Sequence, residues 1–170
     1  MRMRPEKRFC PLCGNRLEKI SHDHRMRLVC TVCKKPLYEN PLPATAAVIL
    51  DHGDHLLLVK RGMEPSKGEW CLPGGFVELD EGPAQGVVRE LAEETGLIGE
   101  VEQLLDCVYE NNPFYGPVII MGYQLTAQGG ELEAGDDAVA VQYFPLTTLP
   151  PIAFDSHQTI INKMITRKNG

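Results

Sequence analysis

The chain has 170 residues, of which 43% are apolar and 24% charged, and this composition excludes a disordered, collagen-like or coiled-coil protein. No apolar stretch approaches the roughly 20 residues of a membrane-spanning helix and no export signal follows the basic start, so we expect a cytoplasmic protein without membrane contact. The net charge of −6 is unevenly spread: residues 1–35 hold ten bases and three acids (+7), whereas the rest holds seven bases and 20 acids (−13), which indicates two modules.

Four cysteines in the basic module are spaced like zinc ligands. Cys10 and Cys13 form one C-x2-C pair, and Cys30 and Cys33 form a second after sixteen residues. Each pair places two thiolates on one side of a tight turn, and two pairs complete a tetrahedron around Zn²⁺. Four thiolates leave no open coordination position, so the ion would be structural and not catalytic. The alternative is four reduced thiols without a metal.

The remaining features of this module leave its partner open. His22 and His24 lie between the two pairs, and we expect them on a solvated turn and not at the metal. With zinc bound through four thiolates, residues 1–35 would keep a net charge near +5, which permits contact with an anionic substrate or a nucleic acid. A basic surface without any ligand is an equal alternative. The two other cysteines, Cys71 and Cys107, are predicted to be buried, reduced thiols.

Pro36, Pro41 and Pro43 force an extended connection after this module. We therefore predict two domains, over residues 1–38 and 39–170. In the second domain, apolar periodicity predicts a helix that begins at Pro83 and ends at Gly96. The other predicted elements are a strand over 44–50, a hairpin turn over 51–54 with a return strand over 55–60, strands over 101–110, 117–127 and 139–144, and a helix over 156–166.

Three carboxylates share one patch of the predicted helix 83–95. Glu90 and Glu94 lie about 40° apart on the helical wheel, and Glu93 lies about 60° from Glu90. Like charges at this spacing repel one another, whereas Mg²⁺ or Mn²⁺ reverses the sign of the interaction. Such ions retain substrate phosphates in their shell, so the patch points to a phosphate substrate. The alternative is a solvated acidic helix face.

The segment from Gly75 to Leu97 resembles the Nudix box. Its spacing Gly75, Glu81, Arg89-Glu90-Leu91, Glu93-Glu94 and Gly96-Leu97 reproduces every position of G-x5-E-x7-R-E-U-x-E-E-x-G-U, where U is aliphatic. The resemblance implies a Nudix hydrolase with an α/β/α sandwich, in which a mixed sheet lies between helices. The small four-cysteine zinc ribbon would precede this domain.

The resemblance also implies the role of each matching residue. Glu90 and Glu94 match the principal metal ligands, Glu93 a further ligand, and the carbonyl of Gly74 often completes the shell. Arg89 matches the residue that holds the glutamates, and Glu81 an outer partner or additional ligand. Two or three Mg²⁺ ions would then neutralise a diphosphate and activate a water. In this family the proton of that water goes to the position of Glu90 or to a late-loop acid, for which the candidates are Glu110, Glu131, Glu133, Asp136 and Asp137.

The four-cysteine ribbon before a Nudix domain resembles two groups, the NADH pyrophosphatases and the plant-type FAD or ADP-ribose pyrophosphatases. The NADH group carries S-Q-P-W-P-F-P-x-S after the box, which is absent here. Pro113 lies sixteen residues after Leu97, near where ADP-ribose-cleaving members tend to carry a proline. We therefore expect a nucleoside diphosphate linked to another moiety, ADP-ribose or FAD, to be cleaved to AMP and a second phosphate ester. Residues that could stack on its base are Phe114, Tyr115 and Phe154.

Two other functions stay open. One is a house-cleaning nucleoside triphosphate or NADH pyrophosphohydrolase. The other is a nucleic-acid-binding or regulatory protein that uses the basic ribbon, which we do not favour. Nudix pyrophosphatases are often dimers, so a homodimer is a further expectation.

Overall fold

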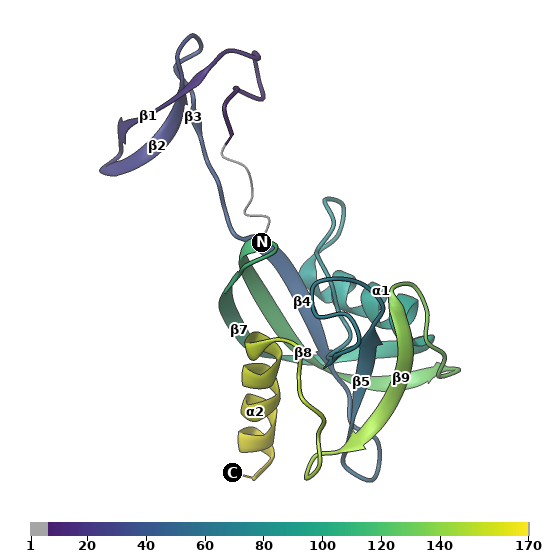
Figure 1. Ribbon diagram of the computed structural model, residues 1–170. Coiled ribbons are helices and arrows are strands. Elements are labelled where there is room, and N and C mark those ends of the chain that lie inside the picture. Colours follow the sequence, from purple (N-terminus) through teal and green to yellow (C-terminus); the bar gives the residue numbers. More distant parts are fainter. Residues whose placement is uncertain (1–6, 170) are drawn as a thin grey trace. The chain divides into compact units, whose positions relative to one another are not determined.

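Three short strands form an antiparallel sheet near the start of the chain. This computed structural model describes residues 7–169, so the first six residues of the predicted ribbon lie outside the described part. Strand β1 (Leu17–His22) pairs with β2 (Arg25–Cys30), and β2 pairs with β3 (Pro36–Leu37). No sequence pattern predicted these strands. They belong to one of two compact units, which reaches to Pro41 and includes Pro113–Gly116 (Figure 1).

The second unit contains two three-stranded sheets. The first sheet has the order β4-β8-β7, formed by β4 (Leu42–Val48), β8 (Gly116–Gly130) and β7 (Leu97–Asn112). The second has the order β6-β5-β9, formed by β6 (Trp70–Cys71), β5 (His55–Arg61) and β9 (Ala138–Pro145). Strand β4 runs parallel to β8, whereas β5 is antiparallel to both of its neighbours. Parallel and antiparallel pairing therefore occur in one domain, as the predicted α/β class requires.

Helix α1 (Pro83–Thr95) packs between the two sheets. It begins with Pro83 at its first position, and it ends at Gly96, whose φ of 71° lies in the left-handed region that glycine tolerates. Its Val87 and Leu91 are fully buried in one cluster with Ala47 of β4, Leu57 of β5 and Leu125 of β8. The apolar stripe that predicted this helix is thus the face that the core covers.

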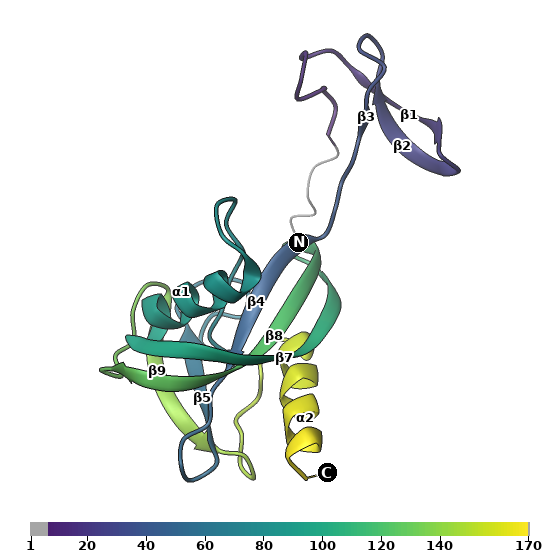
Figure 2. The ribbon, with the colours of Figure 1, turned by 180° about the vertical axis from the view of Figure 1, so that it is seen from behind.

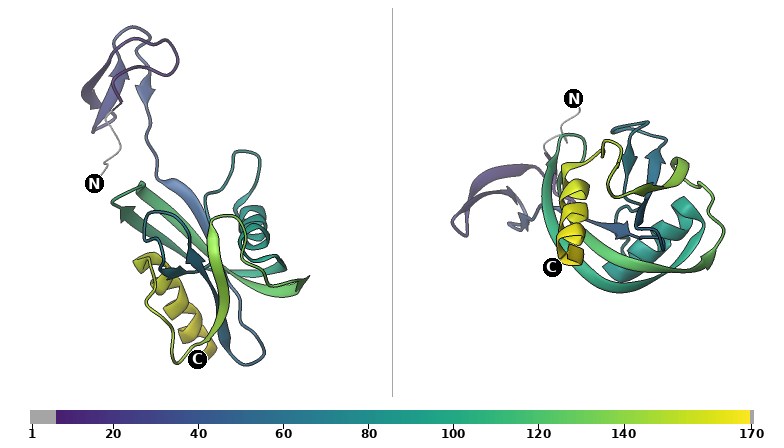
Figure 3. Two further views of the ribbon diagram at one scale, coloured as in Figure 1. Left: turned by 45° about the vertical axis from the view of Figure 1, so that its right-hand side comes forward. Right: turned by 90° about the horizontal axis from the view of Figure 1, so that it is seen from below.

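Helix α2 (Asp155–Asn169) covers the other face of the β4-β8-β7 sheet. Gly122 of β8 approaches Ile160 of α2 so closely that a Cβ there would lie 2.5 Å from the isoleucine side chain. Tyr123, the next residue of β8, instead packs in the α1 cluster. Because neighbouring strand residues point to opposite faces, α1 and α2 lie on opposite sides of this sheet, as Figures 2 and 3 also show. The predicted sandwich of helices around a mixed sheet is confirmed.

The turn predicted at 51–54 forms, but the strands beside it do not continue as a hairpin. The carboxylate of Asp51 accepts hydrogen bonds from the N–H groups of Gly53 and His55, both at 2.8 Å. Beyond the Leu50–Leu56 bridge the strands separate, because β4 pairs with β8 while β5 joins the other sheet. Each strand finds its main partners outside this turn: β4 pairs with β8, and β5 lies between β6 and β9.

The predicted later strands and the last helix lie within β7, β8, β9 and α2, whereas the short strand β6 was not predicted. Cys71 is a buried free thiol as expected, but Cys107 is exposed, because it lies on β7 at the edge of its sheet. Among the described residues, no helix combines the length and apolarity that crossing a membrane requires.

Candidate functional site

The turn after β6 brings Gly74 and Gly75 against strand β4. The carbonyl of Pro73 accepts a hydrogen bond from the N–H of Ala47 (2.7 Å), and the carbonyl of Gly75 accepts one from Thr45 (2.8 Å). At Gly74 the φ angle is 149°, and an added Cβ would lie 2.1 Å from the carbonyl oxygen of Thr45. Only glycine fits a backbone that approaches a strand so closely.

Glu94 reaches this turn from the last part of α1. Its side chain accepts a hydrogen bond at Oε2 from the N–H of Gly74 (2.8 Å), and the residue is only 4% exposed. Burial raises the pKa of Glu94 to about 9 despite the Gly74 hydrogen bond, and the negative charge of Asp137 adds to the shift. In the absence of a cation, this carboxyl group is therefore protonated at neutral pH.

Glu90 lies against the neighbouring glycine. A Cβ at Gly75 would stand 2.5 Å from Oε1 of Glu90, so the carboxylate occupies the space that the glycine leaves. Burial raises the pKa of Glu90, and Arg89 opposes that shift. Glu90 and Glu94 thus both meet the glycine turn, where burial disfavours their charged forms.

Arg89 connects the carboxylates of the box. Its Nε and Nη2 donate to the two oxygens of Glu81 at 3.0 and 2.6 Å, and its Nη1 donates to Glu90 and to Glu93, both at 2.8 Å. The Arg89 hydrogen bonds lower the pKa of Glu81 to about 2, and the N–H of Glu78 contributes. The planar guanidinium thus orients three carboxylates through four hydrogen bonds, whereas a lysine has only three donors and no fixed planar fork.

The donor set suits a hard divalent cation. Glu90, Glu93 and Glu94 carry carboxylate oxygens, and oxygen-rich sites favour Mg²⁺ or Mn²⁺ over softer metals. The raised pKa of Glu94 is consistent with a divalent cation here, since a cation would stabilise the charge that burial disfavours. The carbonyl of Gly74 stays a candidate ligand at the same turn.

The fold distinguishes the five acidic residues that were candidates for taking the proton of the attacking water. Asp137 shares a hydrogen bond with Glu94, and the charge of Asp136 reaches Glu90. Glu110 instead accepts hydrogen bonds from Ser156 and Asn112. The remaining two, Glu131 and Glu133, are exposed beside the end of α1, where the N–H of Glu133 binds the carbonyl of Thr95 at 3.0 Å.

Arg61 was not among the predicted site residues. It lies next to Gly62, whose N–H donates to the carbonyl of Asp137. Burial raises the pKa of the Cys71 thiol to about 12, and the negative charge of Glu94 adds to this shift. The positive charge of Arg61 opposes it. The guanidinium of Arg61 lies 5.1 Å from the centre of the Phe154 ring, and its Nε donates to the carbonyl of Pro65 (2.7 Å). Phe154 is therefore already in contact with Arg61. No periodicity or motif marks Arg61, because the contact joins residues 93 positions apart.

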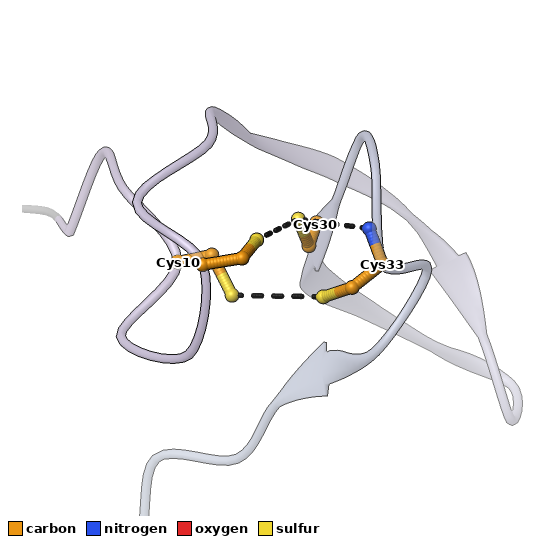
Figure 4. Close-up of side chains that lie close together, drawn as sticks. Cys10, Cys30 and Cys33 are labelled. Carbon is orange, nitrogen blue, oxygen red and sulfur yellow. Dashed lines mark hydrogen bonds between the residues drawn. The ribbon is translucent and has the colours of Figure 1, made fainter.

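The four cysteines of the first unit converge. Their sulfur atoms all lie within 4.8 Å of one another, with Cys10 and Cys33 separated by 3.7 Å and Cys13 and Cys30 by 3.4 Å. Figure 4 shows Cys10, Cys30 and Cys33 pointing toward one another. A tetrahedral ion with Zn–S bonds near 2.3 Å would set its sulfurs about 3.8 Å apart, so this cluster fits Zn²⁺. Hydrogen bonds from Asn15 lower the pKa of Cys13 to about 6. The pKa of Cys33 is instead raised to about 11, because contacts with the other cysteines and burial outweigh the backbone hydrogen bond from Lys35.

Replacing Gly75 with alanine is expected to lower turnover roughly tenfold, because the new methyl group displaces the carboxylate of Glu90. The measurement is the steady-state rate, at several Mg²⁺ concentrations, of the hydrolysis that the Nudix resemblance implies. Gly129→Ala is the matched control, since a Cβ there meets nothing within 4 Å. A Gly75→Ala enzyme as fast as the control would place Glu90 outside the reacting centre.

Both parts of this chain match families of known proteins. Residues 40–164 match the NUDIX domain family, and residues 8–39 match the Nudix N-terminal family of zinc ribbons. A Methanocaldococcus jannaschii protein named ADP-ribose pyrophosphatase is 45% identical over 140 residues, which are 81% of this chain and 80% of that protein.

Two other similar proteins extend the likeness over the first unit. The NAD-capped RNA hydrolase NudC of Pseudomonas aeruginosa is 31% identical over 166 residues, covering 96% of this chain and 57% of that protein. The crystal structure of a NUDIX hydrolase from Nitrosomonas europaea superposes with a TM-score of 0.81 at 26% identity, covering 96% of this chain and 94% of that one.

Proposed function

This chain belongs to the Nudix hydrolase family, and we propose that it cleaves the diphosphate of ADP-ribose or FAD, releasing AMP and a second phosphate ester. Its general activity, hydrolysis of a phosphoric anhydride bond, follows from the family and from the relative at 45% identity. The substrate is supported by the name of that relative, ADP-ribose pyrophosphatase. The observation that carries the proposal is the convergence of Glu90 and Glu94 on the Gly74–Gly75 turn.

The proposed metal site uses residues of the turn and of α1. Glu90, Glu93, Glu94 and the carbonyl of Gly74 would hold Mg²⁺ or Mn²⁺, with Glu81 as an outer partner. Such an ion, when bound, neutralises charge on a diphosphate and acidifies a bound water. Arg89 keeps Glu90 and Glu93 in place, so that little reorganisation is needed when substrate arrives.

Two acids of the loop before β9 are the best placed to take the proton of the attacking water. Asp136 and Asp137 are the late-loop candidates whose charges act on Glu90 and Glu94. A general base must lie within hydrogen-bond reach of the water, which favours them over Glu131 and Glu133. Glu110 accepts hydrogen bonds from Ser156 and Asn112, so we assign it a structural role.

The zinc ribbon, which we place at residues 1–38 before a hydrolase domain over 39–170, has a structural metal in this proposal. Four thiolates close the coordination shell, so zinc would stabilise the ribbon without contacting substrate. A second candidate function concerns the ribbon itself. Its positive charge and the likeness to NudC over both units favour a capped RNA as an alternative substrate.

One substrate panel separates these functions. Pure protein with Mg²⁺ is incubated with ADP-ribose, FAD, NADH, nucleoside triphosphates and an NAD-capped RNA oligonucleotide, and products are resolved by chromatography. We expect AMP from ADP-ribose or FAD at a kcat/KM at least about tenfold above the others. Release of pyrophosphate from triphosphates as the fastest reaction, or decapping that falls steeply with salt, would replace the proposed substrate.

A further inference from the structure

A segment near the end of the chain lies beside the strand that leads into the glycine turn. Ile152 forms a parallel bridge with Trp70 of β6, and the N–H of Ala153 donates to the carbonyl of Trp70 (2.8 Å). Two residues after Trp70 the chain reaches Leu72, Pro73 and then Gly74. The segment before α2 therefore lies beside the residues that lead to the proposed metal site.

His157, in the first turn of α2, accepts a hydrogen bond from the last backbone N–H before Gly74. Its Nδ1 accepts a hydrogen bond from the N–H of Leu72 (3.2 Å), and both residues are buried. Pro73 has no N–H, so the next donor along the chain is the N–H of Gly74, which binds Glu94. Two side chains from two different helices thus hold consecutive donors of one turn.

The hydrogen bond fixes the protonation of the histidine. Because Nδ1 accepts from a backbone amide, the ring is the neutral tautomer with its proton on Nε2. Burial lowers the pKa of His157 to about 4, and the nearby positive charge of Arg61 acts in the same direction. The acceptor is therefore available at every pH where the enzyme is expected to work. The ring also meets Phe154 edge-on, with centres 5.1 Å apart.

Glu110 of β7 holds the first turn of α2 in place. Its Oε2 accepts hydrogen bonds from the hydroxyl and the N–H of Ser156, and its Oε1 accepts from Asn112 (3.0 Å). These hydrogen bonds outweigh desolvation and keep the pKa of Glu110 below its usual value. A carboxylate at a helix N-terminus is also stabilised by the helix dipole. Glu110 thereby sets the position of the neighbouring His157.

We propose that His157 is a positioning residue for catalysis, which holds Leu72 through Nδ1 and so fixes the Gly74–Gly75 turn against which the carboxylates of Glu90 and Glu94 lie. The inference rests on the proposed metal site and not on the identity of the nucleotide substrate. Without the acceptor, the buried N–H of Leu72 has to find another partner, and the turn shifts to reach it. A shift of the turn would loosen Gly74 against Glu94 and Gly75 against Glu90.

The test compares His157→Asn with His157→Leu in the full-length protein. Asparagine places Oδ1 where Nδ1 of histidine stands, whereas leucine fills the space without an acceptor. We expect His157→Leu to raise the Mg²⁺ concentration at half-maximal rate by about tenfold, and His157→Asn to stay within about twofold of wild type. In metal-free ¹⁵N-labelled protein, the amide signals of Leu72 and Gly74 should move in His157→Leu and return toward wild type in His157→Asn.

A milder variant covers the case in which leucine prevents folding. Ser156→Ala removes one hydrogen bond to Glu110 and should shift the Mg²⁺ dependence in the same direction by a smaller amount. An unchanged Mg²⁺ dependence with only a lower melting temperature would overturn the inference, as would equal damage from asparagine and leucine. Failure of the proposed metal site shows separately, because Glu90→Gln and Glu94→Gln would then keep their activity.

Discussion

Replacing Glu90 or Glu94 with glutamine should lower turnover at least about 100-fold while leaving the fold intact. Glutamine keeps the shape of the side chain and removes the charge that holds a divalent ion. Both residues lie at the glycine turn, and Glu94 is buried there. The measurement is kcat at saturating substrate over a wide range of Mg²⁺ concentrations, together with a thermal unfolding curve for each variant.

Glu94→Gln should also stabilise the metal-free protein against unfolding. In the metal-free protein the pKa of Glu94 is raised to about 9, so the folded state holds this proton more tightly than the unfolded state does. The resulting penalty is absent below the unfolded pKa near 4.5 and grows as pH rises toward 9. Glu94→Gln should therefore raise the metal-free free energy of unfolding by several kcal/mol at pH 8, and by little at pH 4.

Glu100→Gln is the matched control, because this glutamate is exposed on β7 and lies outside the box. It should change neither turnover nor the pH dependence of stability. Wild-type rates in Glu90→Gln or Glu94→Gln at high Mg²⁺ would contradict the assignment of these residues as ligands. Lost activity with lost folding would mean that the glutamates act through structure alone.

Removing the ribbon metal should unfold the first unit and spare the hydrolase site. A structural zinc site contributes about 10–16 kcal/mol of binding free energy, which a small three-stranded sheet cannot replace from its own core. Cys10→Ser, or a strong chelator, should therefore abolish zinc content and make residues 7–41 sensitive to protease. The carboxylate site draws none of its residues from this unit, so kcat for a small diphosphate should fall less than about threefold.

Cys107→Ser serves as the control for Cys10→Ser, since Cys107 is exposed and lies outside the four-cysteine cluster. Zinc content is measured by elemental analysis and unfolding by limited proteolysis. One zinc per chain is expected in the wild type and in the control. A metal-free wild-type protein with an intact ribbon, or a stable Cys10→Ser variant, would refute the zinc site.

Much of the second domain was predictable because its signals are local. The spacing of Val87 and Leu91 and the positions of Pro83 and Gly96 predicted α1 correctly, since helix periodicity and end signals act within a few residues. The same spacing placed the three glutamates on one side of the helix. Strand β6 was missed because two residues carry no periodicity, and its partners in β5 are found only by folding.

The sequence by itself determined the family, the cysteine cluster and the acidic helix, because each is written in short, fixed spacings. Only the tertiary structure decided which late-loop acids approach Glu90 and Glu94, since Asp136 and Asp137 come near them by long-range packing. The same holds for His157, which meets Leu72 across 85 positions. Contacts at such separations follow from how sheets and helices pack, and no local pattern of residues records them.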